Sequence, residues 1–358
     1  METTPQQFLA EMFGGADLFV HQPAFRAWLA EAALKSVSLS SAEAVQAAIQ
    51  AFEMREVGPT MIGDVALIHM RGPITYKSSW LSYYFGGACV EDLQAQFRVA
   101  LSDPAVRTIV FRIDSPGGVV TMVPEFADEL FAARGVKPIV AVADTLVASA
   151  AYWLAAQVET IYTSVSGCLG SIGVYLEHIN FSQMLEQAGV KVTLIAHGDR
   201  KVDGHPSQPL SDEVKARIQA RVDEVGAEFE VAVARGRGVT KKIVVETFGQ
   251  GEVLRGQKAI AVGMADKRGT FTQVLARLTK AKMGAGMVLA EADPTPLAAA
   301  ADKPAMHCEI CGKSSCACQE PECPADCPTC APECPCVKEA KEAAALADEH
   351  SIIAACSK

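Results

Sequence analysis

The C-terminal part of the chain contains no aromatic side chain. Residues 284–358 hold no Phe, Trp or Tyr, yet they hold eight of the 18 prolines and ten of the 12 cysteines. Aromatic side chains supply a large share of a buried core, and proline interrupts helices and strands, so this segment has little with which to build one. We expect the hydrophobic core within residues 1–283, where every aromatic side chain lies.

Basic residues and long apolar runs are also scarce. The chain has 32 Lys and Arg against 42 Asp and Glu, and no basic cluster, so we expect no nucleic-acid partner. The most apolar run, Pro138–Ala156, contains Asp144 and many small residues, and Met1–Ala10 lacks the charged-then-apolar order of a secretion signal. We therefore expect a cytoplasmic protein with no signal peptide, no membrane anchor and no membrane partner.

The remaining pattern predicts four regions. Residues 1–60 are expected to form a helical N-terminal extension, with a helix starting at Ser40–Ser41. Residues 61–283 alternate short β-branched runs with helical stretches, which is typical of an α/β domain with a largely parallel sheet and covering helices. Residues 284–305 have a linker composition, and residues 306–358 form an acidic Cys-rich tail that is either disordered or stapled by metal.

Within the α/β region the boundaries follow from the same pattern. Predicted strands are Val65–Met70, Thr108–Ile113, Ile139–Ala143, Thr160–Thr163 and Val190–Ile195. Predicted helices are Val90–Leu101, Val123–Arg134, Ser149–Gln157, Phe181–Gln187, a long helix from Ser211, Lys241–Phe248, Gly256–Val262 and Thr270–Lys282.

Several familiar catalytic motifs are missing. The chain has no GxxxxGK[ST] phosphate loop and no HExxH zinc motif, and Ser149 sits in neither a GxSxG nor an SxxK pattern. Three other segments carry candidate chemistry. Asp114-Ser-Pro-Gly-Gly118 is a strand end whose backbone N–H groups suit an oxyanion hole, although the same residues suit an ordinary turn.

The second and third segments each supply one reactive side chain. Ser149 lies among alanines between a strand and a helix, where it is either a nucleophile or a helix N-cap. Lys201 lies in a glycine-flanked loop, where it is either a general base or a solvated surface charge.

The order of these segments resembles the signal peptide peptidase A-like family of serine peptidases, which have a ClpP/crotonase-like fold and a Ser-Lys dyad. The resemblance covers about Val65 to Leu278. It is carried by six ordered motifs: Gly72-Pro-Ile, Asp114-Ser-Pro-Gly-Gly118, Ala148-Ser-Ala-Ala-Tyr-Trp153, Gly170-Ser-Ile-Gly-Val174, Lys201-Val-Asp-Gly204, and Gly256-Gln-Lys-Ala with Gly263-Met-Ala-Asp266.

The resemblance implies a role for each matching residue. Ser149 matches the nucleophile, Lys201 the general base, and Ser171 a serine that holds the lysine amine. The amides of Gly118 and Ala150 match the oxyanion hole, and the extended substrate is expected to pair near Gly117 and Val119. The family also implies polypeptide substrates, no catalytic cofactor, and a homo-oligomer in which the lysine of one protomer approaches the serine of the next.

The residues of these motifs look most like those of the tailed-phage branch of the family. The members of this branch act on scaffold and capsid proteins in the prohead. Four alternatives stay open. The chain could be a bacterial cytoplasmic enzyme of the signal-peptide-peptidase type that degrades peptides. It could also be a ClpP-type peptidase in which His178, instead of Lys201, is the base. It could be a crotonase-type acyl-CoA enzyme that does not need Ser149, or a non-catalytic scaffold or zinc-binding assembly protein.

The tail has its own metal-binding pattern. Cys308-x2-Cys311 and Cys327-x2-Cys330 have the spacing of a four-thiolate zinc site. Four more cysteines could serve a second ion, namely Cys316, Cys318, Cys334 and Cys336. The competing interpretation is a low-complexity Pro/Cys/Glu repeat without a fixed metal, and nine cysteines within residues 308–336 depart from the C-terminal scaffold extension of some phage relatives.

Overall fold

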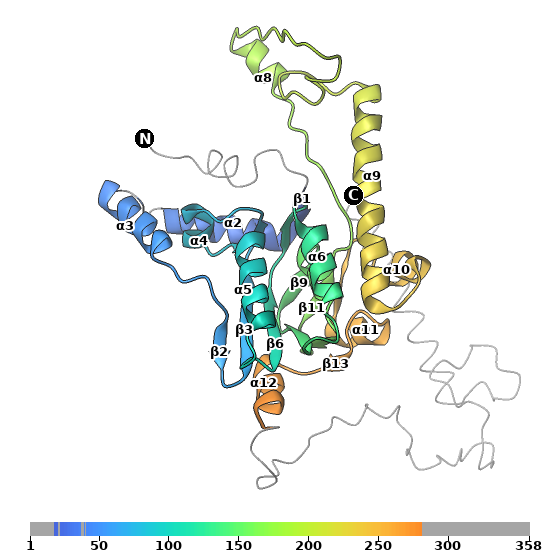
Figure 1. Cartoon of the computed structure of the whole chain (residues 1–358). Coiled ribbons are helices and arrows are strands. Elements are labelled where there is room, and N and C mark those ends of the chain that lie inside the picture. The colour runs from blue at the N-terminus through green and yellow to red at the C-terminus, as the bar shows by residue number, and fades with distance from the viewer. Residues whose placement is uncertain (1–17, 21, 37–38, 40, 281–358) are drawn as a thin grey trace, which may run out of the picture. The chain divides into compact units, whose positions relative to one another are not determined.

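The computed structural model describes residues 18–20, 22–36, 39 and 41–280 (Figure 1). The predicted linker at residues 284–305 and the tail at residues 306–358 lie outside the described residues. So do the predicted zinc ligands Cys308, Cys311, Cys327 and Cys330, and these stay predictions.

A six-stranded sheet forms the centre of the α/β region, in the order β13-β10-β8-β6-β3-β2. Its strands are β2 (Thr60–Ile62), β3 (Val65–Arg71), β6 (Thr108–Asp114), β8 (Ile139–Ala143), β10 (Thr160–Thr163) and β13 (Lys267–Arg268). All neighbours are parallel except β2, which runs antiparallel to β3 at one edge. The α/β class with a largely parallel sheet is therefore confirmed, as are four of the five predicted strands.

Helices cover both faces of this sheet, which explains its nearly continuous apolar strands. On one face lie α5 (Val90–Ser102) and α6 (Val123–Ala132), where the rings of Phe97, Phe111 and Phe126 meet with centroids 6.0–6.4 Å apart. On the other face lies α12 (Phe271–Lys280), whose Val274 packs with alternate strand residues such as Val65 and Leu67.

Two smaller sheets lie beside the carboxyl ends of these strands. One has the order β12-β11-β9, with β9 (Leu146–Ala148), β11 (Cys168–Gly170) and β12 (Val253–Arg255). The other has the order β1-β7-β4-β5, with β1 (Leu18–Val20), β4 (Ile74–Thr75), β5 (Ala88–Cys89) and β7 (Gly117–Val119). The candidate nucleophile Ser149, Ser171, the two candidate oxyanion donors and the candidate substrate-binding residues lie on these two sheets or directly after them.

The helical N-terminal extension is present in its described part. It contains α2 (Gln22–Ser36) and α3 (Ala42–Glu53), and α3 begins where predicted because the Ala44 N–H donates to the Ser41 side chain. The Trp28 indole donates to the Phe85 carbonyl at the end of α4 (Trp80–Phe85), 3.2 Å away. This bond ties the extension to the loop between β4 and β5.

The long predicted helix is α9 (Asp212–Arg237), with Ser211 as its N-cap and Gly238 in the left-handed conformation at its C-terminus. Its buried residues all lie in the C-terminal part, where Phe229 stacks on Trp153 with ring centroids 4.6 Å apart. Helices α10 (Lys241–Thr247) and α11 (Gly256–Ala261) follow it. No helix among the described residues has the length and apolar character needed to cross a membrane.

The predicted strand Val190–Ile195 is wrong. This run follows α8 (Ser182–Gln187), and no described strand pairs with it. Its side chains face solvent, with Ile195 95% exposed and Val190 50% exposed. β-branched residues favour a strand only where a neighbouring strand satisfies the backbone and covers the side chains, and this chain supplies neither here.

Candidate active site

Ser149 occupies a strained turn between β9 and helix α7 (Ala150–Ala155). Its φ is 56° and its ψ is −123°, a backbone conformation that L-residues rarely adopt. The residue is 1% exposed, makes no side-chain cap bond to α7, and its Oγ has no hydrogen-bond partner among the described residues. Ser149 therefore occupies the N-cap position of α7, but its hydroxyl makes no capping bond to the helix.

Ser171 lies next to this turn for a topological reason. Strands β9 and β11 run parallel with Ala148 opposite Gly170, so the residues that follow them leave the same sheet edge together. The Ser149 N–H donates to the Gly170 carbonyl over 2.7 Å, and the Ser171 N–H donates to the Glu252 carbonyl over 2.8 Å. Ser171 also has a positive φ, 54°, so the structure brings two strained serines to one place.

The Pro-Gly-Gly turn forms the third side of the site. Gly117 has a φ of 96°, and a Cβ on Gly118 would lie 1.9 Å from the Ile74 carbonyl oxygen, so both positions require glycine. Gly118 lies on β7, which contacts α7, the helix that begins at Ala150. The two predicted oxyanion donors thus lie on adjacent elements.

Ser115 fixes this turn, and the sequence analysis missed it. It is fully buried, and its hydroxyl donates to the Gly72 carbonyl at 2.7 Å while accepting the Gly117 N–H at 3.1 Å. Its backbone pairs with β9 through Val147. A polar residue between a buried strand and Pro-Gly-Gly was the available signal, because such a residue has to find partners inside the core.

The two large side chains of helix α7 anchor it to neighbouring segments. The Tyr152 hydroxyl donates to the Met264 carbonyl at 3.0 Å, and burial raises the pKa of Tyr152 well above its usual range. Trp153 packs against Phe229 of α9. The neighbours of Ser149 in the sequence, Ala148, Ala150 and Ala151, are small and fully buried.

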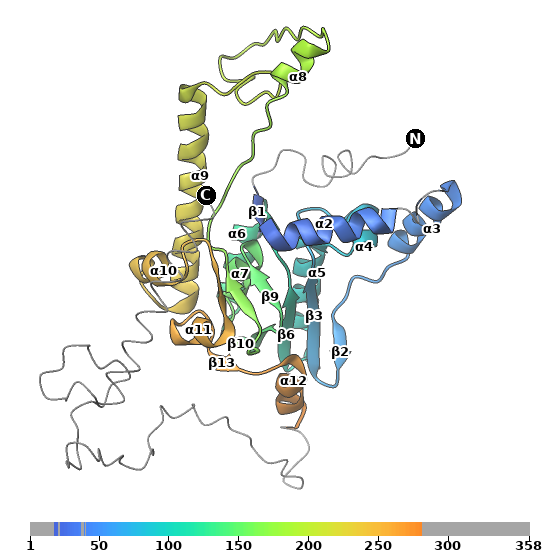
Figure 2. The same ribbon diagram turned by 180° about the vertical axis from the view of Figure 1, so that it is seen from behind.

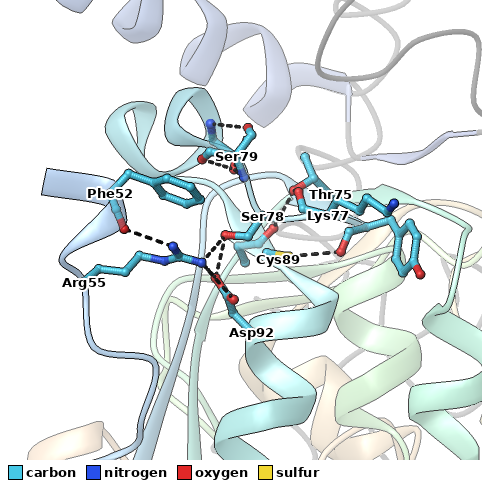
Figure 3. A network of polar contacts seen from close by, with 11 residues as sticks. Phe52, Arg55, Thr75, Lys77, Ser78, Ser79, Cys89 and Asp92 are labelled. Carbon is cyan, nitrogen blue, oxygen red and sulfur yellow. Dashed lines mark hydrogen bonds and ion pairs between the residues drawn. The ribbon is translucent and has the colours of Figure 1, made fainter. Parts of the chain in front are cut away.

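The loop after β4 is anchored by a polar network (Figure 3). The Arg55 guanidinium donates to Ser78 at 2.8 Å and to both carboxylate oxygens of Asp92 at 3.2 Å, and it stacks over the Phe52 ring. On the same loop the Cys89 thiol donates to the Tyr76 carbonyl at 3.0 Å. These bonds fix β4, which pairs with β7, and β5, which pairs with β4 on its other side.

The predicted substrate strand has no open edge in this structure. On one side β7 pairs with β4, with Ile74 opposite Gly118. On the other side β7 pairs antiparallel with β1. The Val119 side chain is 4% exposed and packs with Phe25 of α2, so neither Gly117 nor Val119 faces an empty groove.

Lys201 is not brought to Ser149 within one chain. It is exposed, in a run of turns between α8 and α9, and no hydrogen bond or ion pair joins it to Ser149 among the described residues. This segment lies beside the N-terminal end of α9, whereas α7 packs near the C-terminal end (Figure 1). A helix of 26 residues is about 39 Å long, so the two ends are well separated.

His178, the alternative base, lies on the segment that leaves β11. It is half-buried, and its Nε2 atom has no hydrogen-bond partner among the described residues. No contact with Ser149 is present there either. Within the same residues, no group of three or more His, Cys, Asp or Glu side chains could hold a metal ion.

Comparison with known proteins gives a consistent result. Residues 132–284 match the family model described as Peptidase family S49. The chain is 30% identical over 249 residues to capsid assembly protease C of Escherichia phage lambda, covering 68% of this chain and 56% of that protein. It is also 30% identical to head-tail preconnector protein GP5 of Enterobacteria phage P21, covering 58% of this chain and 41% of that protein.

The chain thus spans about half the length of these curated relatives. Among solved structures, a ClpP1 mutant from Listeria monocytogenes is 12% identical and covers 57% of this chain and 91% of that chain with a TM-score of 0.36. The family model spans the segment that contains Ser149, Ser171 and Lys201. By these sequence matches, the chain belongs to peptidase family S49.

Proposed function

We propose that the chain is a serine endopeptidase in which Ser149 is the nucleophile and Lys201 the general base. The observation that carries this proposal is the Ser149 hydroxyl, which is buried and unpartnered on a strained residue at the start of a helix. Buried polar groups almost always have partners, and strain concentrates at functional sites. A hydroxyl held in this way is available to a base and a substrate carbonyl.

The chemistry follows from this arrangement. A neutral lysine amine takes the proton of Ser149, whose oxygen attacks the carbonyl carbon of the substrate. The oxyanion is stabilised by the amides of Gly118 and Ala150, aided by the positive N-terminal end of α7. The lysine then protonates the leaving amine, water releases the acyl group, and Ser171 acts as a positioning residue for the lysine amine.

We assign the lysine to a second copy of the chain. Two observations support this: among the described residues no hydrogen bond joins Lys201 to Ser149, and the segment that carries Lys201 consists there of exposed and half-buried residues. Exposed apolar side chains gather along that segment, among them Ile179, Phe181, Met184 and Ile195. Contiguous exposed apolar side chains mark interaction sites, which is consistent with a homo-oligomer.

Variants of the full chain test the two roles. Ser149→Ala is expected to abolish both peptide cleavage and labelling by a fluorophosphonate, and Lys201→Ala to abolish cleavage. Lys191→Ala, an exposed lysine on the same segment, is the matched control and should leave activity unchanged. If His178→Ala abolishes cleavage while Lys201→Ala retains it, the general base is the histidine. If Ser149 takes no label and cleavage persists without it, the proposal fails.

Mixing two inactive variants tests the shared site. Ser149→Ala chains still carry the lysine, and Lys201→Ala chains still carry the serine, so mixed assemblies contain complete sites. We expect partial return of cleavage on mixing, with activity that rises more steeply than chain concentration. An absence of any return would place both residues of the dyad in the same chain.

We also propose that the substrates are proteins of a phage head. Two relatives are named for capsid assembly and for the head-tail preconnector, and this chain matches each at 30% identity. Co-expression with candidate capsid and scaffold proteins, followed by mass spectrometry, should show new termini that are absent with Ser149→Ala. If such termini appear only in unrelated cellular peptides, the alternative of a cellular peptidase is supported.

A further inference from the structure

The strand that the proposed function assigns to the substrate is already occupied. Within the described residues, β7 has β4 on one edge and β1 on the other. An extended peptide can add to a strand only at an edge with free N–H and C=O groups. One of these two neighbours must therefore leave before a substrate can pair with β7.

Strand β4 cannot be the one that leaves. Ile74 is fully buried and Thr75 is 4% exposed, and the Thr75 hydroxyl donates to the Ala88 carbonyl on β5. The Ile74 backbone also lies so close to Gly118 that no side chain fits between them. Removing β4 would open the core, so it is a permanent neighbour.

Strand β1 has the opposite properties. It is three residues long and lies at the end of its sheet, where no other strand of the described residues pairs with it. It runs antiparallel to β7, with Leu18 opposite Val119, Phe19 opposite Gly118 and Val20 opposite Gly117. Its backbone thus covers the proposed oxyanion donor and both proposed substrate-binding residues.

Helix α2 holds β1 in place. The helix begins at Gln22, two residues after β1 (Figure 2). Its Phe25 packs against Val119 of β7. A segment tethered this closely has a high effective concentration at its site, so even a short pairing competes with a free peptide. The contacts of α2 are with other elements: the Trp28 indole donates to the Phe85 carbonyl, and Phe25 packs with Val119.

We propose that Leu18–Val20 is an intramolecular competitor for the substrate edge of β7, which an extended polypeptide must displace in order to bind. This inference rests on the proposed function, in which β7 is the substrate strand. Only chains in which β1 has left β7 can bind the substrate. The apparent affinity is therefore the intrinsic affinity multiplied by the fraction of chains in this open state. With about one chain in ten open, release of β1 lowers KM about tenfold and leaves kcat unchanged.

Proline substitution in the full chain tests this competition. In an antiparallel pair, alternate residues direct their N–H groups at the partner, so the inward donors of β1 are either that of Phe19 or those of Leu18 and Val20. Leu18→Pro combined with Phe19→Pro removes at least one inward donor in both cases. Leu18→Ala combined with Phe19→Ala loses the same side chains but keeps both donors, and it is the matched control. A chain lacking residues 1–20 serves as a second variant that retains α2.

Two readouts keep the inference separate from the proposed function. Hydrogen exchange of the Gly117–Val119 amides reports the loss of β1 without any catalysis, and we expect faster exchange in the proline and truncated variants. KM for a peptide substrate should fall about tenfold in these two variants, and less in the alanine control.

The inference is overturned if the amides exchange at the wild-type rate in the truncated chain, or if exchange accelerates while KM stays the same. In either case the proposed function still holds, provided that the wild-type chain cleaves peptides. If no variant cleaves peptides or takes a fluorophosphonate label, the proposed function itself fails.

Discussion

Replacing Ser149 with alanine should make the folded chain more stable. A buried hydroxyl without a partner costs the folded state about 1–3 kcal/mol, because the water it bonds in the unfolded chain is not replaced. The backbone strain at φ 56° is the same for both residues, since alanine also has a Cβ, and it cancels. We therefore expect a gain of about 1–2 kcal/mol, which for a domain of this size raises Tm by roughly 2–8 °C.

Ser115→Ala is the matched control, because it makes the same chemical change at an equally buried serine. Its hydroxyl has two partners, the Gly72 carbonyl and the Gly117 N–H, and both would be left buried without it. We expect a loss of about 1–3 kcal/mol. The two substitutions should therefore shift stability in opposite directions although they remove the same atom.

Urea or thermal denaturation at a chain concentration where light scattering shows monomers provides the assay. In an assembled oligomer the gain from Ser149→Ala should shrink, since a lysine of the neighbouring copy then bonds the hydroxyl. A stability loss for monomeric Ser149→Ala comparable to that of Ser115→Ala would refute the reasoning, because it would mean that the Ser149 hydroxyl has a partner inside one chain.

Three further changes have expected outcomes. Phe229→Ala empties a fully buried ring site and should lower the free energy of unfolding by about 3–5 kcal/mol in urea denaturation. Gly118→Ala places a Cβ 1.9 Å from a β4 carbonyl oxygen and should abolish cleavage and increase sensitivity to an added protease, whereas Gly58→Ala, with open space around its Cβ, should do neither. Burial raises the pKa of the Cys89 thiol to about 11, so at pH 8 its thiolate fraction is about a hundredfold smaller than that of a thiol with the reference pKa of 9.0. Its alkylation at pH 8 should therefore be slower than that of an exposed thiol, and equal rates would contradict the burial.

Much of the fold could be predicted because local pattern and packing agree in the α/β region. Strands Ile139–Ala143 and Thr160–Thr163 have the predicted bounds, since a continuous β-branched run is what a strand covered on both faces requires. The start of α9 was predictable from Ser211 followed by two acidic residues. The ends of helices were less predictable, as fraying and capping shift them by a few residues.

Three features could not be read from local pattern. The run Val190–Ile195 has strand composition, but composition does not reveal whether a partner strand exists. The pairing of β1 with β7 joins segments about a hundred residues apart and involves only three residues of each strand. Ser149 and Ser171 have positive φ values directly after the paired strands β9 and β11. In a sequence such a conformation is signalled mainly by glycine, and both residues are serines.

The proposed assembly gives one explanation for three features of the chain. Among the described residues, the buried Ser149 hydroxyl has no partner, Lys201 is exposed, and Val190–Ile195 has strand composition without a neighbouring strand. The unpartnered hydroxyl and the exposed apolar run each cost the isolated chain stability. A second copy that supplies the lysine and covers the exposed segment would remove both costs at once. Under that proposal a dispersed chain is inactive, so peptide hydrolysis is restricted to the place where copies of the chain are concentrated.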